Sequence, residues 1–197
     1  MKPEDDNELL LTRSPALMSR RDTGLLVIDV QQKLIPLIPG QGRIVWNIGR
    51  LLDAAAVLGV PAAGTEQYPK GLGPLVPELR TRLTIVPEKL AFSCLDAKLF
   101  APGVFAGREK LLVCGIETHV CVQQTVLDLL AAGVAVYVAM DAVGTRHAID
   151  HEVALKRMDG AGAVLTTTEA AIFELCETAA APEFKQLSQL IRQAPPQ

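Results

Sequence analysis

The side chains best suited to chemistry in this chain each follow a short apolar run. They form four small polar groups: Asp29 with Gln31, Glu66-Gln67, Glu88-Lys89, and Glu117-Thr118-His119. A carboxylate that is partly removed from water has a raised pKa, which makes it a usable proton acceptor. A cysteine near a cation can supply a nucleophilic thiolate. Asp29, Lys89 and Cys121 are therefore candidates for a base, a cation and a nucleophile.

Each of these three residues also has a plain structural interpretation. Asp29 could brace the turn after its strand, and Lys89 could be a solvated loop charge, because lysine is rarely buried. Cys121 could be a small buried hydrophobe, which is the usual fate of a free cysteine. That interpretation fits the other three cysteines better, since none of them follows a strand and opens a helix: Cys94, Cys114 and Cys176.

Apolar runs and helical periodicities alternate along the chain. Short aliphatic runs predict strands at 25–28, 60–63, 83–86, 111–114, 134–139 and 163–165. Helical spacing predicts helices at 44–58, 120–132, 148–159, 168–179 (with Thr168 as a possible cap) and 183–192, and a Gly- and Pro-rich loop at 64–77. This alternation indicates an α/β fold, a doubly wound α/β/α sandwich around a mostly parallel, Rossmann-like sheet of about six strands.

In such sheets ligands bind beyond the carboxyl ends of the strands. We therefore expect Asp29, Lys89 and Cys121 to meet at one edge of the sheet. Cys121 should lie in the first turn of the helix 120–132, where the helix dipole and free N–H groups favour a thiolate. Such surroundings lower a cysteine pKa from about 8.5 to between about 3.5 and 7.5. The same N–H groups could hold the oxyanion of a tetrahedral intermediate.

Composition limits the possible functions. The 197 residues fit a single domain, 1–197, in which 1–22 is expected to be a poorly ordered or extended N-terminal arm. The net charge is −3 without clustered Lys and Arg, which argues against binding nucleic acid. No apolar run approaches the roughly 18 residues that span a bilayer, and no export signal is apparent. We expect a cytoplasmic protein with reduced thiols and no membrane partner.

Three segments together resemble the signature blocks of the isochorismatase-like cysteine hydrolase family. They read Leu-Val-Ile-Asp-Val-Gln at 26–31, Lys-Leu-Ala-Phe-Ser at 89–93, and Gly-Ile-Glu-Thr-His-Val-Cys-Val at 115–122. Thr125 and Asp128 fit the run that usually follows the cysteine. The resemblance covers roughly 24–175. The segment Thr-Glu-Gln-Tyr-Pro-Lys-Gly-Leu-Gly at 65–73 is similar to the subgroup called isochorismatase domain-containing proteins.

The resemblance implies a small-molecule substrate and a division of roles. It makes Asp29 the general base, Lys89 the group that polarises the pair, and Cys121 the nucleophile. It also implies a cis peptide between Ile116 and Glu117, with the N–H groups of Glu117 and Cys121 as the oxyanion hole. Candidates for the walls of the substrate pocket are Gln31, Gln67, Tyr68, Phe92 and Ile116.

The metal site of the family's nicotinamidases is not expected here. Those enzymes hold a metal through an Asp and several His near the second strand, where this chain has Glu66-Gln67-Tyr68-Pro69. His147 and His151 have the i, i+4 spacing of helix ligands, but no third ligand is apparent, so a solvated or capping role is expected. We therefore predict no metal and no cofactor.

Three functions remain open on the sequence. The favoured one is hydrolysis of an amide-type C–N bond through a thioester at Cys121. Hydrolysis of a vinyl ether in an isochorismate-like substrate would rely on proton donation by Asp29 and would not need the cysteine. A non-catalytic binding or scaffold protein could keep the same fold. Self-association into a homo-oligomer is expected, because the apolar content is 49% and the segment 95–104 carries little charge.

Overall fold

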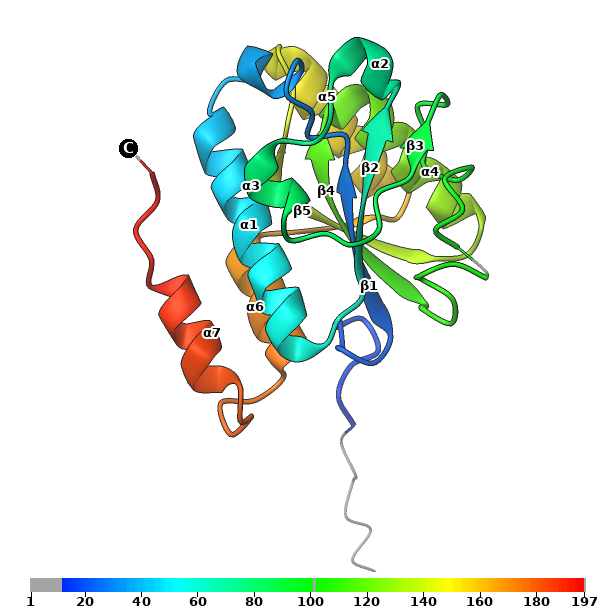
Figure 1. The fold of residues 1–197 in the computed structure, drawn as a ribbon. Coiled ribbons are helices and arrows are strands. Elements are labelled where there is room, and N and C mark those ends of the chain that lie inside the picture. The colour runs from blue at the N-terminus through cyan, green and yellow to red at the C-terminus, as the bar shows by residue number, and fades with distance from the viewer. Residues whose placement is uncertain (1–11, 101, 197) are drawn as a thin grey trace, which may run out of the picture.

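Six strands lie side by side in one parallel sheet, in the order β3-β2-β1-β4-β5-β6 (Figure 1). The structure is a computed structural model that describes residues 12–100 and 102–196. The strands are β1 Thr23–Ile28, β2 Ala62–Gln67, β3 Glu88–Lys89, β4 Lys110–Ile116, β5 Ala135–Gly144 and β6 Val164–Thr166. This confirms the predicted doubly wound α/β architecture.

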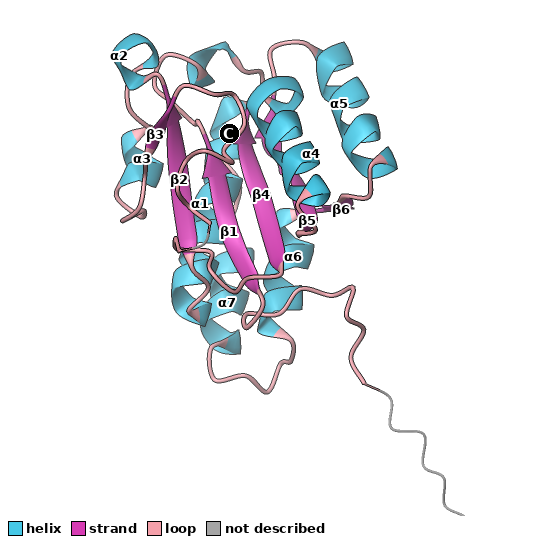
Figure 2. Ribbon diagram, turned by 90° about the vertical axis from the view of Figure 1, so that its right-hand side faces the viewer, coloured by secondary structure: helices cyan, strands magenta, loops and turns pink. Residues whose placement is uncertain are grey.

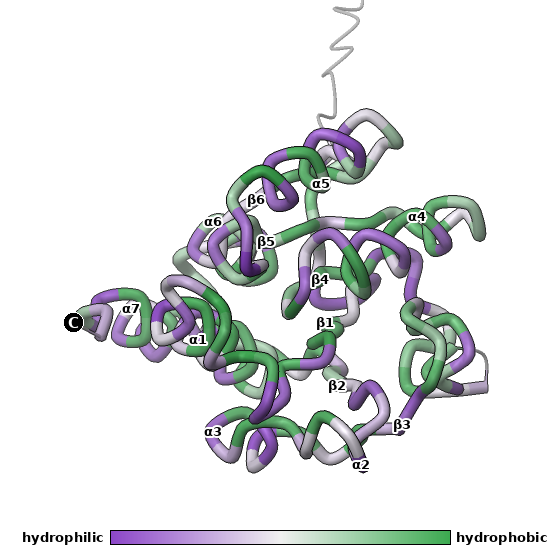
Figure 3. The backbone as a smooth tube through the Cα atoms, turned by 90° about the horizontal axis from the view of Figure 1, so that it is seen from above, coloured by the Kyte–Doolittle hydropathy of each residue, from purple (hydrophilic) through white to green (hydrophobic). Residues whose placement is uncertain are grey.

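Helices cover both faces of the sheet, as Figures 1 and 2 show. They are α1 Gln41–Leu58, α2 Pro69–Leu72, α3 Pro77–Arg80, α4 Gln123–Ala131, α5 Ala148–Gly160, α6 Thr168–Cys176 and α7 Phe184–Ile191, with single turns at Ile35–Leu37 and Thr118–Val122. Helices α1 and α6 pack on one face and α4 and α5 on the other. Seen from above in Figure 3, α7 lies outside α1, with which it is in contact.

The first strand shows how the sequence builds two cores. All six residues of β1 are buried, because a central parallel strand is covered on both faces. Leu25 and Val27 point into the core beneath α1 and α6, whereas Leu26 and Ile28 point into the core beneath α4 and α5. This period of two is the ordinary alternation of strand side chains. The strand ends at Ile28, and Asp29 follows it with a left-handed backbone.

A glycine brings the ends of β1 and β4 together. Gly115 has φ of 124°, which L side chains rarely adopt, and a β-carbon there would collide with the backbone of Ile28. Ile28 is also its register partner in the sheet. The close approach places the segment after β4, which carries Glu117 and Cys121, next to Asp29 at the end of β1.

Three predicted strands differ most from the observed ones, and one of them is β5, which runs to Gly144 rather than ending at 139. The second strand covers 62–67 rather than 60–63, so residues 64–67 belong to the sheet and not to a loop. Thr65 is in register with Ile28, and Gln67 with Lys89. The third strand is Glu88–Lys89 rather than 83–86, although the Gly64 N–H still bonds to Ile85 O at 3.0 Å. The end of β2 is polar, and the side chains of Thr65 and Gln67 there contact Asp29 and Lys89.

Helix ends also differ in detail from the prediction. Thr167, not Thr168, caps α6 by accepting a hydrogen bond from the N–H of Ala170 at 3.4 Å. The Thr168 hydroxyl instead donates to Asp141 Oδ1 at 2.9 Å. The helix stops at Cys176 rather than 179, because Glu177 adopts φ of 67°. The short helices α2 and α3 each begin at a proline, a residue favoured at the first helical position.

The first strand is preceded by a segment that packs on the fold. Of the predicted N-terminal arm 1–22, residues 1–11 lie outside the described part of the chain. Ala16 O accepts from Tyr137 Oη at 2.6 Å, and Leu17 O accepts from Lys110 Nζ at 2.7 Å. Within residues 12–100 and 102–196, none of the helices combines the length and hydropathy needed to cross a membrane.

Candidate active site

Asp29 directly follows β1, and it is a fully buried carboxylate in a left-handed conformation, with φ of 52°. Its Oδ2 accepts from Lys89 Nζ at 2.6 Å, and its Oδ1 accepts from Thr65 Oγ1 at 2.8 Å. A buried carboxylate is costly unless it is paired and hydrogen-bonded, and here both oxygens are engaged. The two contacts come from β3 and β2, the strands beyond β1 on that side of the sheet. They fix the carboxylate in one orientation.

Lys89 is buried beneath this edge, with only 1% of its side chain exposed. Its ammonium lies within hydrogen-bonding distance of Asp29 Oδ2, of Gln67 Oε1 at 2.9 Å, and of the Phe92 and Ala91 carbonyls at 2.9 and 3.2 Å. A lysine ammonium has three donors, so these acceptors use all of them. The solvent-facing interpretation of Lys89 is therefore wrong.

Cys121 lies in the π-helical turn Thr118–Val122 that leads into α4, and only 6% of it is exposed. Burial raises the pKa of its thiol, and the charge of Asp29 acts in the same direction. Lys89 lowers the pKa but does not outweigh these effects. The expectation of a lowered thiol pKa at a helix start is thus wrong, because the thiol is buried and Asp29 disfavours a second negative charge beside it.

The backbone beside the cysteine offers two N–H groups. The Ile116–Glu117 peptide bond is cis. The N–H groups of Val120 and Val122 both donate to Glu117 O, at 3.1 and 3.3 Å. In the described part of the chain the Glu117 N–H has no acceptor, and the Cys121 N–H has none outside its own turn. These are the donors expected for an oxyanion hole.

The residues proposed as pocket walls fall into two groups. Gln31 and Gln67 form a brace: Gln31 Nε2 donates to Gln67 O and Gly73 O, Gln31 Oε1 accepts from Gln67 N, and Gln67 Nε2 donates to Leu90 O. Tyr68 and Phe92 are half exposed, whereas Ile116 is fully buried. A cavity of about 440 Å³ lies beside Lys89, lined also by Tyr68 and Leu90.

Sequence and structure comparisons agree on the relatives of this chain. Residues 23–170 match the model of the isochorismatase domain. The chain belongs to the isochorismatase family. Mouse isochorismatase domain-containing protein 2A is 40% identical over 172 residues, which are 87% of this chain and 84% of that protein. The resemblance to this family is therefore confirmed.

Two solved structures of similar proteins share the fold. The MAR1 ribonuclease of Caenorhabditis elegans is 38% identical with a TM-score of 0.87, over 92% of this chain and 95% of its own. The Escherichia coli YcaC gene product, described as an octameric hydrolase of unknown specificity, is 28% identical with a TM-score of 0.82, over 91% of each chain. The family as a whole supports a hydrolase-type function.

Three residues around the candidate nucleophile were not singled out from the sequence as site residues. Thr125, which fits the family run after the cysteine, donates from Oγ1 to Cys121 O at 2.6 Å and accepts from the Cys94 N–H at 3.0 Å. Thr65 Oγ1 lies 3.6 Å from Cys94 Sγ as well as bonding Asp29. Burial and the charge of Asp29 raise the pKa of the Cys94 thiol to about 11. Cys94 therefore borders the site, although no strand-to-helix turn marks it.

The Glu117 side chain is a structural clamp in this member of the family. Its Oε2 accepts from Thr145 Oγ1 at 2.9 Å and from the backbone N and Nε of Arg146, both at 3.1 Å. Burial alone would raise the pKa of Glu117, but the hydrogen bonds from Arg146 and Thr145 outweigh it and lower the pKa. The clamp ties the segment after β4 to the segment after β5. Thr145 Oγ1 also lies 2.8 Å from His119 Nδ1.

The residues near β2 give no support to a metal site of the nicotinamidase kind. Across 12–100 and 102–196, no three His, Cys, Asp or Glu residues are arranged to hold a metal ion. His151 Nδ1 instead lies 3.0 Å from Thr118 Oγ1, and burial lowers its pKa. His147 occupies the N-cap position of α5 without a capping side-chain bond. The i, i+4 pair therefore does not converge on a third ligand.

Proposed function

We propose that this protein is a cysteine hydrolase that cleaves an amide-type C–N bond of a small molecule, with Cys121 as nucleophile, Asp29 as base and Lys89 as the group that orients Asp29. The observation that carries the proposal is the buried Asp29–Lys89 pair, joined at 2.6 Å, whose charges both act on the Cys121 thiol. Nucleophile, base and orienting group from three strand ends are the arrangement that activates a weak nucleophile.

The first half of the reaction forms a thioester. Asp29 takes the thiol proton as Cys121 Sγ attacks the substrate carbonyl carbon, and the carbonyl electrons move to oxygen. The N–H groups of Glu117 and Cys121 then bind that oxyanion. Collapse of the intermediate breaks the C–N bond, and the amine leaves with the proton from Asp29. The raised thiol pKa suits this order, because the resting group is a thiol whose proton moves only during attack.

The second half releases the acid. Asp29 takes a proton from water, the resulting hydroxide adds to the thioester carbonyl, and Cys121 leaves and regains its proton. Lys89 stays in place throughout, since its three donors are already used by Asp29, Gln67 and the backbone. Its part is to hold the carboxylate in one orientation. The substrate therefore contacts Asp29, Cys121 and the two N–H groups.

Mass spectrometry of the protein mixed with a panel of small amides and esters tests this proposal. We expect an acyl adduct on Cys121 and loss of turnover in Cys121→Ala. Cys176→Ala is the matched control, because Cys176 is a buried thiol whose hydrogen bond goes to Thr178 O in the C-terminal part of the chain. No adduct and no turnover with any compound would contradict the thioester and favour the non-catalytic alternative. Full turnover in Cys121→Ala would also contradict the thioester, but it would assign catalysis to a reaction that does not need the cysteine.

Vinyl-ether hydrolysis remains the enzymatic alternative within the same fold. Asp29 would then donate a proton to the vinyl group, and Cys121 would not form a covalent bond. The Cys121→Ser variant separates the two reactions, because serine beside Asp29 preserves polarity but is a far weaker nucleophile. Retained activity on an enol ether would support this alternative, whereas loss of activity on every substrate supports the thioester.

RNA hydrolysis is a third candidate reaction, suggested by the name of the C. elegans structural relative. The net charge of −3 argues against it, because RNA-binding surfaces usually present clustered basic side chains. Incubation of a labelled single-stranded RNA with the wild-type chain and with Asp29→Asn tests it. Cleavage that disappears in Asp29→Asn would assign the nuclease reaction to this site and replace the amide proposal.

We further propose a cytoplasmic homo-oligomer. The loop after Lys89 presents Leu90, Phe92 and Leu95 to solvent, and Leu90 is 78% exposed. Apolar patches of this kind usually mark interfaces. The octameric state of the E. coli relative is consistent with an assembly. Light scattering after gel filtration measures the mass, and a monomer that persists at high concentration would contradict this proposal.

A further inference from the structure

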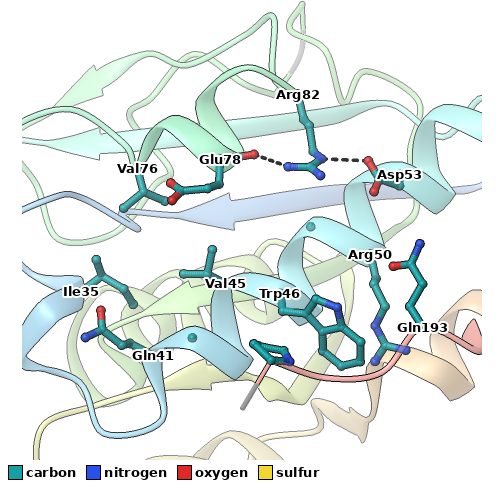
Figure 4. Close-up of a pocket in the computed structure, with 13 residues that line it drawn as sticks. Ile35, Gln41, Val45, Trp46, Arg50, Asp53, Val76, Glu78, Arg82 and Gln193 are labelled. Carbon is teal, nitrogen blue, oxygen red and sulfur yellow. Dashed lines mark hydrogen bonds and ion pairs between the residues drawn. The ribbon is translucent and has the colours of Figure 1, made fainter. Parts of the chain in front are cut away.

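A groove of about 470 Å³ runs along α1, away from the candidate active site (Figure 4). Helix α3 and the segment after α7 form its other sides. Its walls include the apolar side chains of Ile35, Val45 and Val76, and two glycines of α1, Gly42 and Gly49, leave its floor open. This volume falls within the roughly 300 to 1,000 Å³ of small-molecule pockets. None of Asp29, Lys89 and Cys121 lines it.

Arg50 brings to this groove a positive charge that no carboxylate in the described part of the chain contacts. The residue is only 7% exposed, and its guanidinium carbon lies 3.8 Å from the centre of the Trp46 ring. Nη2 donates to Asn47 Oδ1 at 2.7 Å, whereas Nε is buried without a hydrogen-bond partner. No carboxylate of the described residues lies within 4.0 Å of the guanidinium. Burial lowers the pKa of Arg50 and outweighs the charges of Asp141 and Glu169, which act to raise it from a greater distance.

The second arginine of the groove differs in this respect. Arg82 Nε bonds to Asp53 Oδ1 at 2.8 Å, and the Glu78 carbonyl accepts from its Nη1. The charges of Arg82 and Asp53 therefore cancel within the wall. Glu78 lies beside Val76, at the other end of the groove from Arg50 in Figure 4. An anion that enters the groove is thus attracted to the Arg50 end.

We propose that this groove is a second binding site, for a small carboxylic acid with an apolar body. The carboxylate would accept from the guanidinium of Arg50, whose Nη1 makes no hydrogen bond to any described residue. The apolar body would lie along Val45, Val76 and Ile35. An acid of this kind supplies a carboxylate in contact with Arg50, and a charge-assisted hydrogen bond is about twice as strong as a neutral one.

The single tryptophan of the chain allows a direct test. Trp46 lines the groove and contacts Arg50, so its fluorescence reports on this site alone. The full-length protein is titrated with benzoate, phenylacetate and octanoate to millimolar concentration, and with their neutral amides in parallel. We expect a saturable change with at least one acid and none with its amide. Calorimetry of the same acid gives the dissociation constant for the variants.

Variants separate charge recognition from the shape of the groove. Arg50→Gln should weaken binding about tenfold or more, because it removes the charged donor. Arg43→Gln is the matched control, since Arg43 is an exposed arginine of the same helix that does not line the groove. Gly42→Leu should abolish binding while keeping Arg50. A β-carbon at Gly42 meets nothing within 4 Å, and leucine favours the helix, so the fold should be retained.

A Cys121→Ser protein should bind the acid as the wild type does, because Cys121 does not line the groove. Three results would overturn the proposal: no saturable response to any of the acids, equal binding of an acid and its amide, or unchanged affinity in both Arg50→Gln and Gly42→Leu. Loss of binding in Cys121→Ser would instead assign the acid to the candidate active site, which also contradicts a separate site.

Discussion

Lys89 and Arg50 are both buried cations, yet the protein treats them differently. Lys89 has a carboxylate at 2.6 Å and three further oxygens within 3.2 Å, all from its own chain. Arg50 has one hydrogen bond to Asn47 and the face of Trp46. Removing a charge from water costs several kcal/mol unless a partner replaces the lost hydration. Lys89 has such a partner in Asp29. Arg50 has no carboxylate within 4.0 Å among the described residues, and in our proposal a bound acid supplies it.

The difference separates a group that organises a site from a group that receives a ligand. The donors of Lys89 are saturated, so Lys89 acts on the reaction only through the orientation of Asp29. The guanidinium of Arg50 retains unused donors beside an open volume. If this comparison is right, breaking the Asp29–Lys89 pair should be costly, and replacing Arg50 by an apolar side chain should not.

The largest effect is expected from Asp29→Asn. Asparagine tolerates the left-handed backbone of this position, so the change isolates the charge. It leaves Lys89 buried without a counter-ion, which should lower the free energy of unfolding by about 3 to 5 kcal/mol. Loss of the general base should reduce kcat/KM by a factor of about 10² to 10⁴. Urea denaturation and the rate on the amide identified by adduct trapping measure the two effects.

The double variant Asp29→Asn with Lys89→Met serves as the control for this prediction. It removes both charges, so most of the lost stability should return while activity stays absent. A single Asp29→Asn variant as stable as the wild type would show that Lys89 does not depend on Asp29. In that case Lys89 and Arg50 would not differ in their need for a carboxylate partner within the protein.

A smaller effect is expected from Thr125→Val. The valine leaves the buried N–H of Cys94 without an acceptor and the Cys121 carbonyl without its donor. We expect a loss of about 2 kcal/mol in unfolding free energy, the usual cost of unsatisfied buried groups. Thr125→Ser keeps the hydroxyl and should recover most of it. Thermal and urea unfolding of the pair measure this, and equal losses in both variants would indicate that the methyl group matters instead.

A pH-dependent effect is expected from Glu117→Gln. The hydrogen bonds from Arg146 and Thr145 lower the pKa of Glu117 below its ordinary value of 4.5. A lowered pKa in the folded state adds stability above the unfolded-state pKa, and that stability is lost as the pH falls through the folded-state value. The variant should therefore be about 1 kcal/mol less stable at pH 7. The gap should close in acid, and a gap that stays constant from pH 7 to pH 3 would contradict this account.

Much of the candidate site followed from the sequence because it depends on strand ends. The aliphatic run 25–28 predicts a buried strand, and parallel strands bring their carboxyl ends to one edge. Asp29 and Lys89 meet there for that reason. The end of β2 was missed because Thr65, Glu66 and Gln67 are polar. Their side chains bond to Asp29, to Lys89 and to the backbone. A strand whose polar side chains find such partners only in the folded protein has no recognisable pattern in the sequence.

The sign of the Cys121 pKa shift was also beyond the sequence. A helix start predicts a lowered thiol pKa, but the outcome depends on burial and on how close Asp29 lies. The burial of Arg50 could not be predicted from the sequence either. An arginine in an amphipathic helix ordinarily faces solvent, and only the packing of α3 and the segment after α7 beside α1 encloses it. Both cases turn on distances between elements that no local pattern encodes.

The smallest effect is expected from Arg50→Met, and it tests the comparison most directly. Methionine keeps much of the side-chain volume and loses a hydrogen bond of about 1 kcal/mol and a cation–π contact of similar size. It also removes a buried charge with no carboxylate partner, and relief of that cost offsets the losses. The unfolding free energy should therefore change by less than about 1 kcal/mol, against about 3 to 5 kcal/mol for Lys89→Met, which leaves Asp29 unpaired. Urea denaturation of both variants measures these two losses of unfolding free energy.

Added carboxylic acid should raise the stability of the wild type but not of Arg50→Met, because a ligand stabilises only the state that binds it. Equal losses in the two variants would mean that Arg50 has a partner within the protein, and the groove would then have no charge left to offer a ligand.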